Sequence, residues 1–403
     1  MYTNRHHLTY CTNIHPGESW EETFSNLKKY IPKIKAEVSP DTSFGIGLRL
    51  SDKASASLME GNNLSIFKEW LAESDCYVFT FNGFPFGGFH HQSVKDQVHH
   101  PDWTTNLRLD YTLRLFNILS ALLPKEMDGG ISTSPLSYKY WEDVKNNKKE
   151  VLQKATFHII RIAERLINIQ QEKDQVLHLD IEPEPDGLLE NTHEVIDWYK
   201  DWLIPQGIQY LKEQLNFTDE EAEKCLKRHI RLCYDVCHFA IVYEKPREVF
   251  SLLANEGIKI GKIQISAALK ASLSKNVAQR GSVKDALAPF VESTYLHQVV
   301  ERSSKNKFTH YPDLPQALEN MNNPDAREWR THFHVPVFLA NYGQLESTQE
   351  DILDILEYIK GKKITNHLEV ETYTWEVLPD DIQLEIVDSI VRELQWVQKK
   401  LIK

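Results

Sequence analysis

The stretch VLHLDIEPEPDG, residues 176–187, joins an alternating apolar run to a group of acidic residues. In a β-strand, side chains at alternate positions share one face, so His178, Asp180 and Glu182 point the same way. Carboxylates crowded at the end of a strand repel one another unless a cation lies between them. We therefore expect a metal ion near the end of this strand, held together with residues from other parts of the chain.

Seven further β-rich runs accompany this one, and stretches with helical periodicity separate them. The runs are residues 7–14, 44–51, 76–83, 129–135, 230–236, 258–266 and 367–372. An α/β chain in which eight strands alternate with helices predicts a closed parallel (β/α)8 TIM barrel. No Gly-x-Gly-x-x-Gly motif follows any of the runs, which disfavours an open nucleotide-binding sheet.

The regular alternation breaks after the run 258–266. A long excursion, residues 268–330, ends in a ninth β-like run at 332–338 before the next helical pattern at 348–360. We interpret 268–330 as an enlarged loop or lid after strand seven, and expect a second enlarged loop after strand three. The segment 379–401 fits a closing helix with Ile386, Ile390 and Leu394 on one face. The expected organisation is one barrel domain over residues 1–403.

Composition narrows the class of protein. The chain of 403 residues has 41% hydrophobic residues and a net charge of −12, which indicates a folded globular protein and opposes a nucleic-acid partner. Its 5 cysteines are scattered, as is usual in a reducing compartment. The N-terminus lacks a signal-peptide core, and no run is long enough to span a membrane. We expect a cytoplasmic protein without membrane insertion that binds a small-molecule substrate.

Polar residues follow several of the predicted strands, where a TIM barrel carries its active site. They are Glu182, Asp235 with His238, Gln264, and Glu371 beyond Glu369. Oxygen ligands with one or two imidazoles suit Mg²⁺, Mn²⁺ or a Zn²⁺ site with open positions. For any single acid, an ion pair with Lys or Arg inside the barrel is the alternative to metal binding. The alternation of side chains along the strand also leaves open whether Glu369 or Glu371 enters the site.

These residues resemble the site of the xylose isomerase-like TIM barrels, a superfamily of sugar isomerases, ketose epimerases and AP endonucleases of family 2. A closer resemblance is to the EboE group, described as metabolite traffic proteins. The strings that carry it are LTYCTNIHPGESWEE, FNGFPFGGFHHQSVKDQVHHPDW, YLHQVV, RTHFHVPVF and HLEVETYTW. The resemblance implies a role in making or handling a small metabolite.

The superfamily resemblance also implies ligands. Glu182, Asp235 and Glu371 match its metal-binding carboxylates, and Gln264 stands where a His is usual. His238 matches a ligand of a further metal in the endonuclease branch, and His334, in the His332-x-His334 pair, resembles another. That branch also uses histidines at the ends of strands three and four, where this chain has Asn82 and Ser132. A complete three-metal nuclease site is therefore not expected.

In the isomerase and epimerase branch, the resemblance implies that Glu182 and Glu371 flank the reacting carbon. A metal that polarises a carbonyl acidifies the neighbouring C–H, and a placed carboxylate takes the proton. The candidate catalytic residues are therefore Glu182 and Glu371, and the candidate metal is Mn²⁺, Mg²⁺ or Zn²⁺. The candidate substrate-binding residues are His15, His90, His91, Arg330 and His332.

The sequence thus favours a metal-dependent sugar or sugar-phosphate isomerase or epimerase that acts on a polyhydroxy metabolite. Two other functions stay open. A non-catalytic protein that binds or carries a metabolite is favoured by Gln264, because a neutral amide binds metal more weakly than imidazole. A phosphodiesterase of the AP endonuclease kind is disfavoured by the net charge and by the missing histidines.

Overall fold

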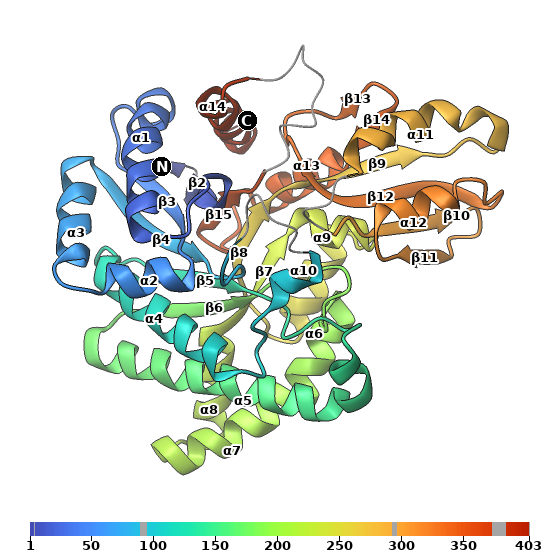
Figure 1. The fold of residues 1–403 in the computed structure, drawn as a ribbon. Coiled ribbons are helices and arrows are strands. Elements are labelled where there is room, and N and C mark those ends of the chain that lie inside the picture. The colour runs from blue at the N-terminus through green and yellow to red at the C-terminus, as the bar shows by residue number, and fades with distance from the viewer. Residues whose placement is uncertain (4, 89–94, 292–295, 373–383, 403) are drawn as a thin grey trace.

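A nine-stranded sheet, curled into a nearly closed barrel, forms the centre of the molecule (Figure 1). The computed structural model describes residues 1–3, 5–88, 95–291, 296–372 and 384–402. The strand order of the nine-stranded sheet is β1, β2, β15, β8, β7, β6, β5, β4, β3. All neighbouring strands are parallel except β1 and β2. The strands are β1 (Tyr2–Thr3), β2 (His6–Tyr10), β3 (Phe44–Arg49), β4 (Cys76–Asn82), β5 (Gly129–Thr133), β6 (Leu177–Ile181), β7 (Ile230–Asp235), β8 (Ile260–Ile265) and β15 (His367–Val370). Each of the eight predicted strands is present.

Side chains help to bring the two ends of the sheet together between β2 and β3. One parallel bridge joins Cys11 to Gly47. Beside it, the Gly47 amide donates to Thr9 Oγ1 at 3.0 Å and the Arg49 amide to Thr12 Oγ1 at 2.9 Å. Threonine hydroxyls thus accept bonds that a continuous ladder would place on backbone carbonyls.

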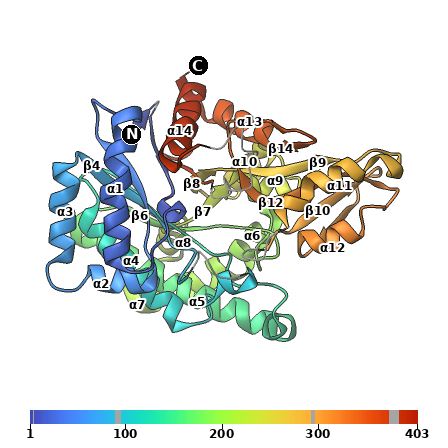
Figure 2. The same ribbon diagram turned by 45° about the horizontal axis from the view of Figure 1, so that its top comes forward.

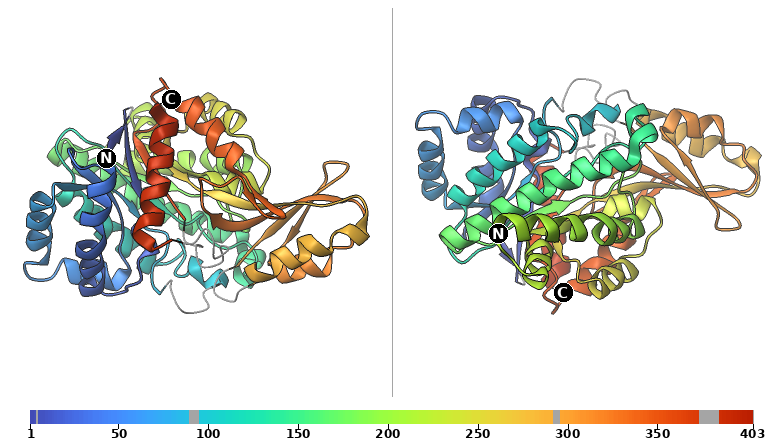
Figure 3. Two further views of the ribbon diagram at one scale, coloured as in Figure 1. Left: turned by 90° about the horizontal axis from the view of Figure 1, so that it is seen from above. Right: turned by 90° about the horizontal axis from the view of Figure 1, so that it is seen from below.

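Helices cover the outside of the barrel (Figure 3), so that strands such as β6 and β8 are buried along their whole length. Strands covered on both faces read as nearly continuous apolar runs. The helices around the barrel are α1 (Trp20–Val38), α2 (Asp52–Leu58), α3 (Asn63–Glu73), α4 (Asn106–Leu122), α5 (Glu142–Lys173), α6 (Thr192–Trp198), α7 (Ile204–Leu215), α8 (Asp219–His229), α9 (Val236–Ile241), α10 (Pro246–Asn255), α13 (Gln349–Ile359) and α14 (Ile386–Ile402). The closing helix α14 buries Ile390 and Leu394, in agreement with the sequence pattern.

The barrel interior contains a buried ion pair between β8 and β15. Lys262 Nζ lies 3.1 Å from Glu369 Oε1, and both side chains are inaccessible to solvent. Gly47 makes room for this carboxylate, since a Cβ there would lie 2.1 Å from Glu369 Oε2. Pairing with a lysine inside the barrel, the alternative considered for every acid, therefore holds for Glu369.

Residues 267–291 and 296–347 contain a second, six-stranded sheet that projects from one side of the barrel (Figure 2). Its order is β11, β10, β12, β9, β14, β13. The elements are β9 (Ala267–Ser272), α11 (Gly281–Leu287), β10 (Val299–Ser303), β11 (Phe308–Tyr311), α12 (Leu314–Glu319), β12 (Ala326–Val335), β13 (Asn341–Tyr342) and β14 (Leu345–Ser347). We call this segment the inserted sheet.

The inserted sheet differs from the loop expected at 268–330. Strand β12 begins at Ala326 rather than at His332, so the expected boundary at Arg330 falls inside a strand. The sequence pattern missed the start of β12 because this part of the strand contains charged residues. Arg330 and Glu328 are buried there as an ion pair with a separation of 2.9 Å. Whether the sheet acts as a lid stays a prediction.

No helix among the described residues combines the length and apolar character needed to cross a membrane.

Candidate functional site

A pocket opens at the carboxyl ends of the barrel strands, where the sequence places the candidate site. It encloses about 640 Å³, counted out to its open mouth, which is within the usual range for small-molecule sites. It is lined by Asn13, Asn82, Phe84, Pro85, Lys95, Val98, His99, Glu182, Glu184, His238, Leu296, Gln298, His332, His334 and Glu371. The barrel and the inserted sheet both contribute residues to the wall of this pocket.

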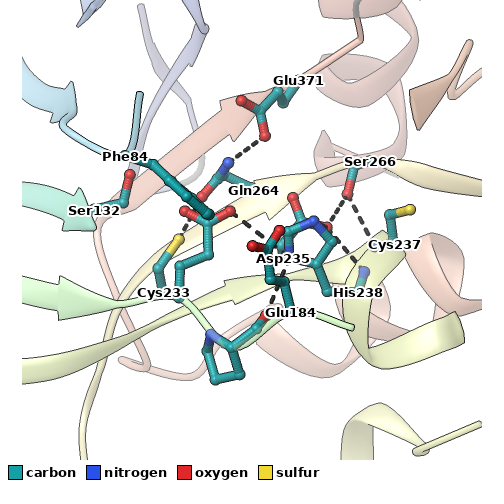
Figure 4. Close-up of polar contacts among 12 residues, drawn as sticks. Phe84, Ser132, Glu184, Cys233, Asp235, Cys237, His238, Gln264, Ser266 and Glu371 are labelled. Carbon is teal, nitrogen blue, oxygen red and sulfur yellow. Dashed lines mark hydrogen bonds and ion pairs between the residues drawn. The ribbon is translucent and has the colours of Figure 1, made fainter. Parts of the chain in front are cut away.

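Three predicted carboxylates come from the ends of β6, β7 and β15, and Figure 4 shows two of them, Asp235 and Glu371. Glu182, Asp235 and Glu371 are all buried. Asp235 Oδ1 accepts bonds from Ser266 Oγ at 2.7 Å and from the His238 amide at 3.1 Å. Asp235 Oδ2 and Glu182 Oε2 have no hydrogen-bond partner among the described residues. Buried carboxylate oxygens without partners are costly unless a ligand satisfies them.

Glu371 is held by side-chain amides. Asn13 Nδ2 and Asn82 Nδ2 donate to its Oε1 at 2.7 and 3.0 Å. Gln264 Nε2 donates to Oε2, while Gln264 Oε1 accepts from the Cys233 thiol. In this orientation the amide nitrogen of Gln264, which has no lone pair to offer, faces Glu371. This geometry does not favour Gln264 as a metal ligand, and that role stays a prediction.

Burial dominates the electrostatics of the three acids. It raises the pKa of Asp235 to about 7 and the pKa of Glu371 to about 7. Burial also raises the pKa of Glu182 well above its usual value, and the neighbouring carboxylates of Glu371 and Asp235 raise it further. Each acid thus resists ionisation chiefly because solvent is far, and for Glu182 and Glu371 also because another carboxylate of the group is close.

No Lys or Arg in the described part of the chain lies within ion-pair distance of these acids. Lys95, the single Lys or Arg among the described pocket residues, pairs with Asp313 at 3.0 Å. A divalent cation would neutralise the cluster once the acids are ionised, and oxygen donors beside imidazoles are suitable ligands for it.

Two imidazoles supply an independent sign of a cation. His238 Nδ1 lies 3.1 Å from the Pro183 carbonyl oxygen, which only accepts, so Nδ1 carries the proton. His332 Nδ1 lies 2.9 Å from Gln298 Oε1. The Gln298 amide is oriented by its Nε2, which donates to the Pro185 carbonyl at 3.2 Å, so His332 Nδ1 carries the proton too.

The Nε2 atoms of His238 and His332 therefore both present lone pairs, and they lie 3.1 Å apart. Burial holds the pKa of each imidazole well below its usual value, so neither gains a second proton easily. Two facing lone pairs at this distance repel, whereas two nitrogens on one Zn²⁺ at about 2.0–2.1 Å are separated by a comparable distance. Hydrogen bonds from the opposite ring nitrogens are the usual way in which ligating histidines are oriented.

His334 lies beside this pair and links it to the acids. Its Nδ1 lies 3.1 Å from the Glu371 carbonyl oxygen, and its Nε2 lies 4.0 Å from Asp235 Oδ2. Asp235, His238 and His334 form one group of three potential ligands, and Glu184, His238 and His332 form another. The site thus offers two overlapping groups of potential ligands, which share His238.

Several pocket residues are not among the predicted site residues. Glu184 Oε1 lies 2.9 Å from His99 Nε2, and both line the pocket. Asn13, Asn82 and Gln298 act through amide groups, which no metal-ligand spacing reveals. The EPEP pattern after β6 was a signal for Glu184 that the alternation argument did not use.

Other predicted residues lie apart from the cluster. The guanidinium of Arg330 binds Glu328, Asp351 and the Ala240 carbonyl, and it does not line the pocket. The His15 ring stacks on Tyr30 of α1 with ring centroids 4.3 Å apart. Their expected contact with substrate therefore finds no support in the geometry. His90 and His91 lie outside the described residues.

The raised acid pKa values predict how the stability of chelator-treated protein depends on pH. Asp235 and Glu371 titrate near pH 7 when folded but near pH 4 when unfolded. Between these values the folded state binds more protons, so the free energy of unfolding falls as pH rises. We expect each of the two acids to contribute a loss of about 2 kcal/mol between pH 5.5 and 8, measured by urea denaturation.

The variant Asp235→Asn is the control for this slope. Other acids with raised pKa values, including Asp186 and Glu393, contribute equally to both proteins. The variant should therefore show a shallower slope, and equal slopes would mean that Asp235 titrates normally.

Comparisons with protein-family models and with curated proteins find no match. Several solved structures resemble the chain distantly. A xylose isomerase-like TIM barrel protein from Mycobacterium smegmatis in complex with magnesium is 9% identical, with a TM-score of 0.49 over 100% of this chain and 98% of that one. The IOLI protein with a bound zinc atom is 11% identical, with a TM-score of 0.48 over 98% and 97%. The probable 3-DHS dehydratase AsbF from Bacillus anthracis is 11% identical, with a TM-score of 0.44 over 96% and 97%. Likenesses this distant assign neither a reaction nor a ligand to the chain.

Proposed function

We propose that this chain is a divalent-metal-dependent enzyme of the sugar isomerase or epimerase kind, which moves a proton next to the carbonyl of a small polyhydroxy compound. The observation that carries the proposal is the group of three buried carboxylates without a Lys or Arg partner in the described chain, Glu182, Asp235 and Glu371. The facing imidazoles of His238 and His332 support it independently.

Asp235, His334 and Glu371 would hold the metal, together with one oxygen of Glu182. When bound, a divalent ion polarises a substrate carbonyl and acidifies the adjacent C–H. Glu371 has enough acceptor capacity left for this role, since each carboxylate oxygen can accept two bonds and its Oε2 accepts one from Gln264.

Glu182 is the better candidate for the general base. Its Oε1 lies 3.8 Å from His238 Nδ1, while its Oε2 has no hydrogen-bond partner among the described residues. One oxygen can therefore face a metal while the other takes a proton from carbon and later returns it. A raised pKa suits this exchange near neutral pH. The carboxylate of Glu371, fixed by three amides, is better suited to holding position than to moving protons.

The pocket wall supports a small polar substrate. Phe84, Pro85, Val98 and Leu296 give it apolar surface, which limits the access of water to a reactive intermediate. Leu296, Gln298, His332 and His334 come from the segment of the inserted sheet, so we propose that this sheet completes the site. We also propose, from the resemblance to the EboE group, that the protein acts in making or handling a small metabolite. We propose further that it acts in the cytoplasm and does not bind nucleic acid.

Metal analysis and proton exchange test this function together. Purified protein should contain at least one equivalent of Mn²⁺, Mg²⁺ or Zn²⁺ by elemental analysis. In D₂O it should introduce deuterium next to the carbonyl of a compound in a panel of ketoses and ketose phosphates, as followed by NMR. Metal without exchange on any member of the panel would contradict the isomerase reaction and leave a metabolite-binding protein.

A phosphodiesterase is the second candidate, and the group of His238, His332 and Glu184 favours it. Such enzymes use two or more metal ions about 3.5–4 Å apart. Two equivalents of metal, with hydrolysis of a phosphodiester and no deuterium exchange, would establish it in place of the isomerase.

A further inference from the structure

A buried acid outside the pocket lies behind two of the candidate metal ligands. Glu393 is in the middle of α14, the helix that closes the barrel, and its side chain is buried. Its buried neighbours on this helix include Ile390, Leu394 and Val397. Glu393 does not line the pocket, so any effect that it has on the site passes through other residues.

One oxygen of Glu393 joins two segments that are distant in the sequence. The Val337 amide donates to Glu393 Oε1 at 3.0 Å, and the Thr372 hydroxyl donates to the same oxygen at 2.9 Å. Val337 follows the end of β12, and Thr372 follows the end of β15. Both donors belong to buried residues, and hydrogen bonds are electrostatically stronger in such surroundings than in water.

Each of these two segments contains a candidate metal ligand. His334 precedes Val337 by three residues, and Glu371 directly precedes Thr372. His334 Nδ1 donates to the Glu371 carbonyl oxygen at 3.1 Å. The bonds to Glu393 therefore support, from outside the pocket, a contact that the two candidate ligands also make with each other.

The strands that precede these segments belong to different sheets. Strand β12 pairs with β9 and β10 in the inserted sheet, whereas β15 pairs with β2 and β8 in the barrel. A shared backbone ladder would fix the register of the two strands, but β12 and β15 are not joined by one. Side-chain contacts therefore determine part of their relative placement.

The residue before Glu393 contacts the same segment after β12. The guanidinium carbon of Arg392 lies 3.8 Å from the centroid of the Phe338 ring. Phe338 directly follows Val337. Two consecutive residues of α14 thus contact two consecutive residues of the chain that leaves β12.

The packing of α14 does not itself explain a carboxyl group at this position. Burial raises the pKa of Glu393 to about 8, so the group is mostly neutral at pH 7. A polar group still costs free energy when it leaves water, and only its hydrogen bonds offset that cost. An apolar residue would pack α14 against the barrel without this cost, so the two bonds are the better explanation for the acid.

We propose that Glu393 is a positioning residue, which fixes the separation of His334 and Glu371 from outside the pocket. It acts through the ends of β12 and β15, so that both ligands can meet one ion without rearrangement. The inference rests on the proposed function, since it presumes a metal held by these two residues.

The Zn²⁺ affinity of three variants tests the proposal. Glu393→Ala loses both bonds, and its affinity should fall by about 10-fold, the low end of the usual loss for partners of metal ligands. Glu393→Gln keeps an uncharged side chain of the same shape with an acceptor oxygen, so it should stay within a few-fold of wild type. Thr372→Val loses one bond and should fall between them. Affinity is measured by titrating chelator-treated protein in the presence of a competing chelator.

Leu394→Ala is the matched control for loosened packing of the helix. Leu394 is buried beside Glu393 on α14, and its truncation leaves a cavity that lowers stability while both bonds of Glu393 remain. This control should therefore unfold at lower urea concentration but keep the zinc affinity of wild type. Equal losses of affinity in Leu394→Ala and Glu393→Ala would overturn the proposal, because any loosening of α14 would then have the same effect.

Chelator-treated protein gives a second readout that does not depend on metal. NMR of protein with isotope-labelled histidine should show a slowly exchanging proton on His334 Nδ1, assigned by its absence in His334→Gln. This signal should be lost in Glu393→Ala, because the bond to the Glu371 carbonyl loosens. It should be retained in Glu393→Gln and in Leu394→Ala.

The two readouts separate this inference from the proposed function. If wild-type protein binds no Zn²⁺, the metal-dependent function fails, and a retained His334 signal in Glu393→Ala would overturn the positioning role as well. If Zn²⁺ binds, unchanged affinity in Glu393→Ala would overturn the positioning role and leave the function standing. If Glu393→Ala does not fold, wild-type affinity in Thr372→Val would overturn it.

Discussion

Replacing Glu182 with Gln should slow proton exchange next to the substrate carbonyl by about 100- to 10,000-fold, the usual contribution of a general base. An amide keeps the size of the side chain and one oxygen for a metal, but it takes up no proton near neutral pH. The two candidate bases differ in their hydrogen bonds. Glu182 Oε2 has no partner among the described residues, whereas both carboxylate oxygens of Glu371 accept bonds. We therefore expect the loss for Glu182→Gln to lie in kcat.

Two controls separate this loss from a loss of fold or of metal. Glu190→Gln changes a buried acid in the segment that follows the same strand, paired with Lys139 and outside the pocket, and should keep the exchange rate within a few-fold. Elemental analysis of Glu182→Gln should still find metal. If Glu182→Gln exchanges protons at the wild-type rate while Glu371→Gln does not, then Glu371 is the base.

The second large effect concerns Asp235, where the substitution to Asn should have opposite effects with and without metal. In the metal-free protein, Asn removes a buried charge for which the described chain has no Lys or Arg partner. The free energy of unfolding should rise by about 1–3 kcal/mol at pH 8, the usual cost of a buried polar group left unsatisfied. With metal present, an NH₂ group in place of Oδ2 points its protons at the ion, and affinity should fall by at least about 100-fold.

Asp351→Asn is the matched comparison for Asp235→Asn. Asp351 is also buried, but it pairs with Lys245 at 3.1 Å and Arg330 at 3.5 Å. Its replacement leaves cations without their partner, so the metal-free protein should become less stable. Urea denaturation and metal titration of both variants check the signs. A drop in stability of metal-free Asp235→Asn would show that the carboxylate is already satisfied within the protein.

The barrel is well predicted from the sequence because its strands carry a strong local signal. Residues such as Leu177, Leu179 and Ile181 alternate with polar ones that point inward, and each apolar run is bounded by turn residues. The inserted sheet is not predicted beyond the β-like run at 332–338, because the first part of β12 contains Glu328 and Arg330. Their burial depends on a pairing that only the folded strand creates.

The site is predicted in its carboxylates but not in its supporting groups. Alternation places both Glu369 and Glu371 inside the barrel, and the lysine at 262, on the neighbouring strand, decides which one stays in the interior. The role of Gln264 depends on which end of its amide meets Cys233, and strand spacing holds no information on this. Asn13 and Asn82 meet Glu371 from distant segments, so their contact is a property of the closed barrel.

Anomalous X-ray diffraction from crystals grown with Mn²⁺ or Zn²⁺ tests the central proposal most directly. The proposal requires a peak at about 2.0–2.3 Å from oxygens of Asp235 and Glu371 and from Nε2 of His334. A peak between the Nε2 atoms of His238 and His332 would add the second ion. Diffraction that shows no metal there, with the three carboxylates turned onto Lys or Arg side chains, would contradict it.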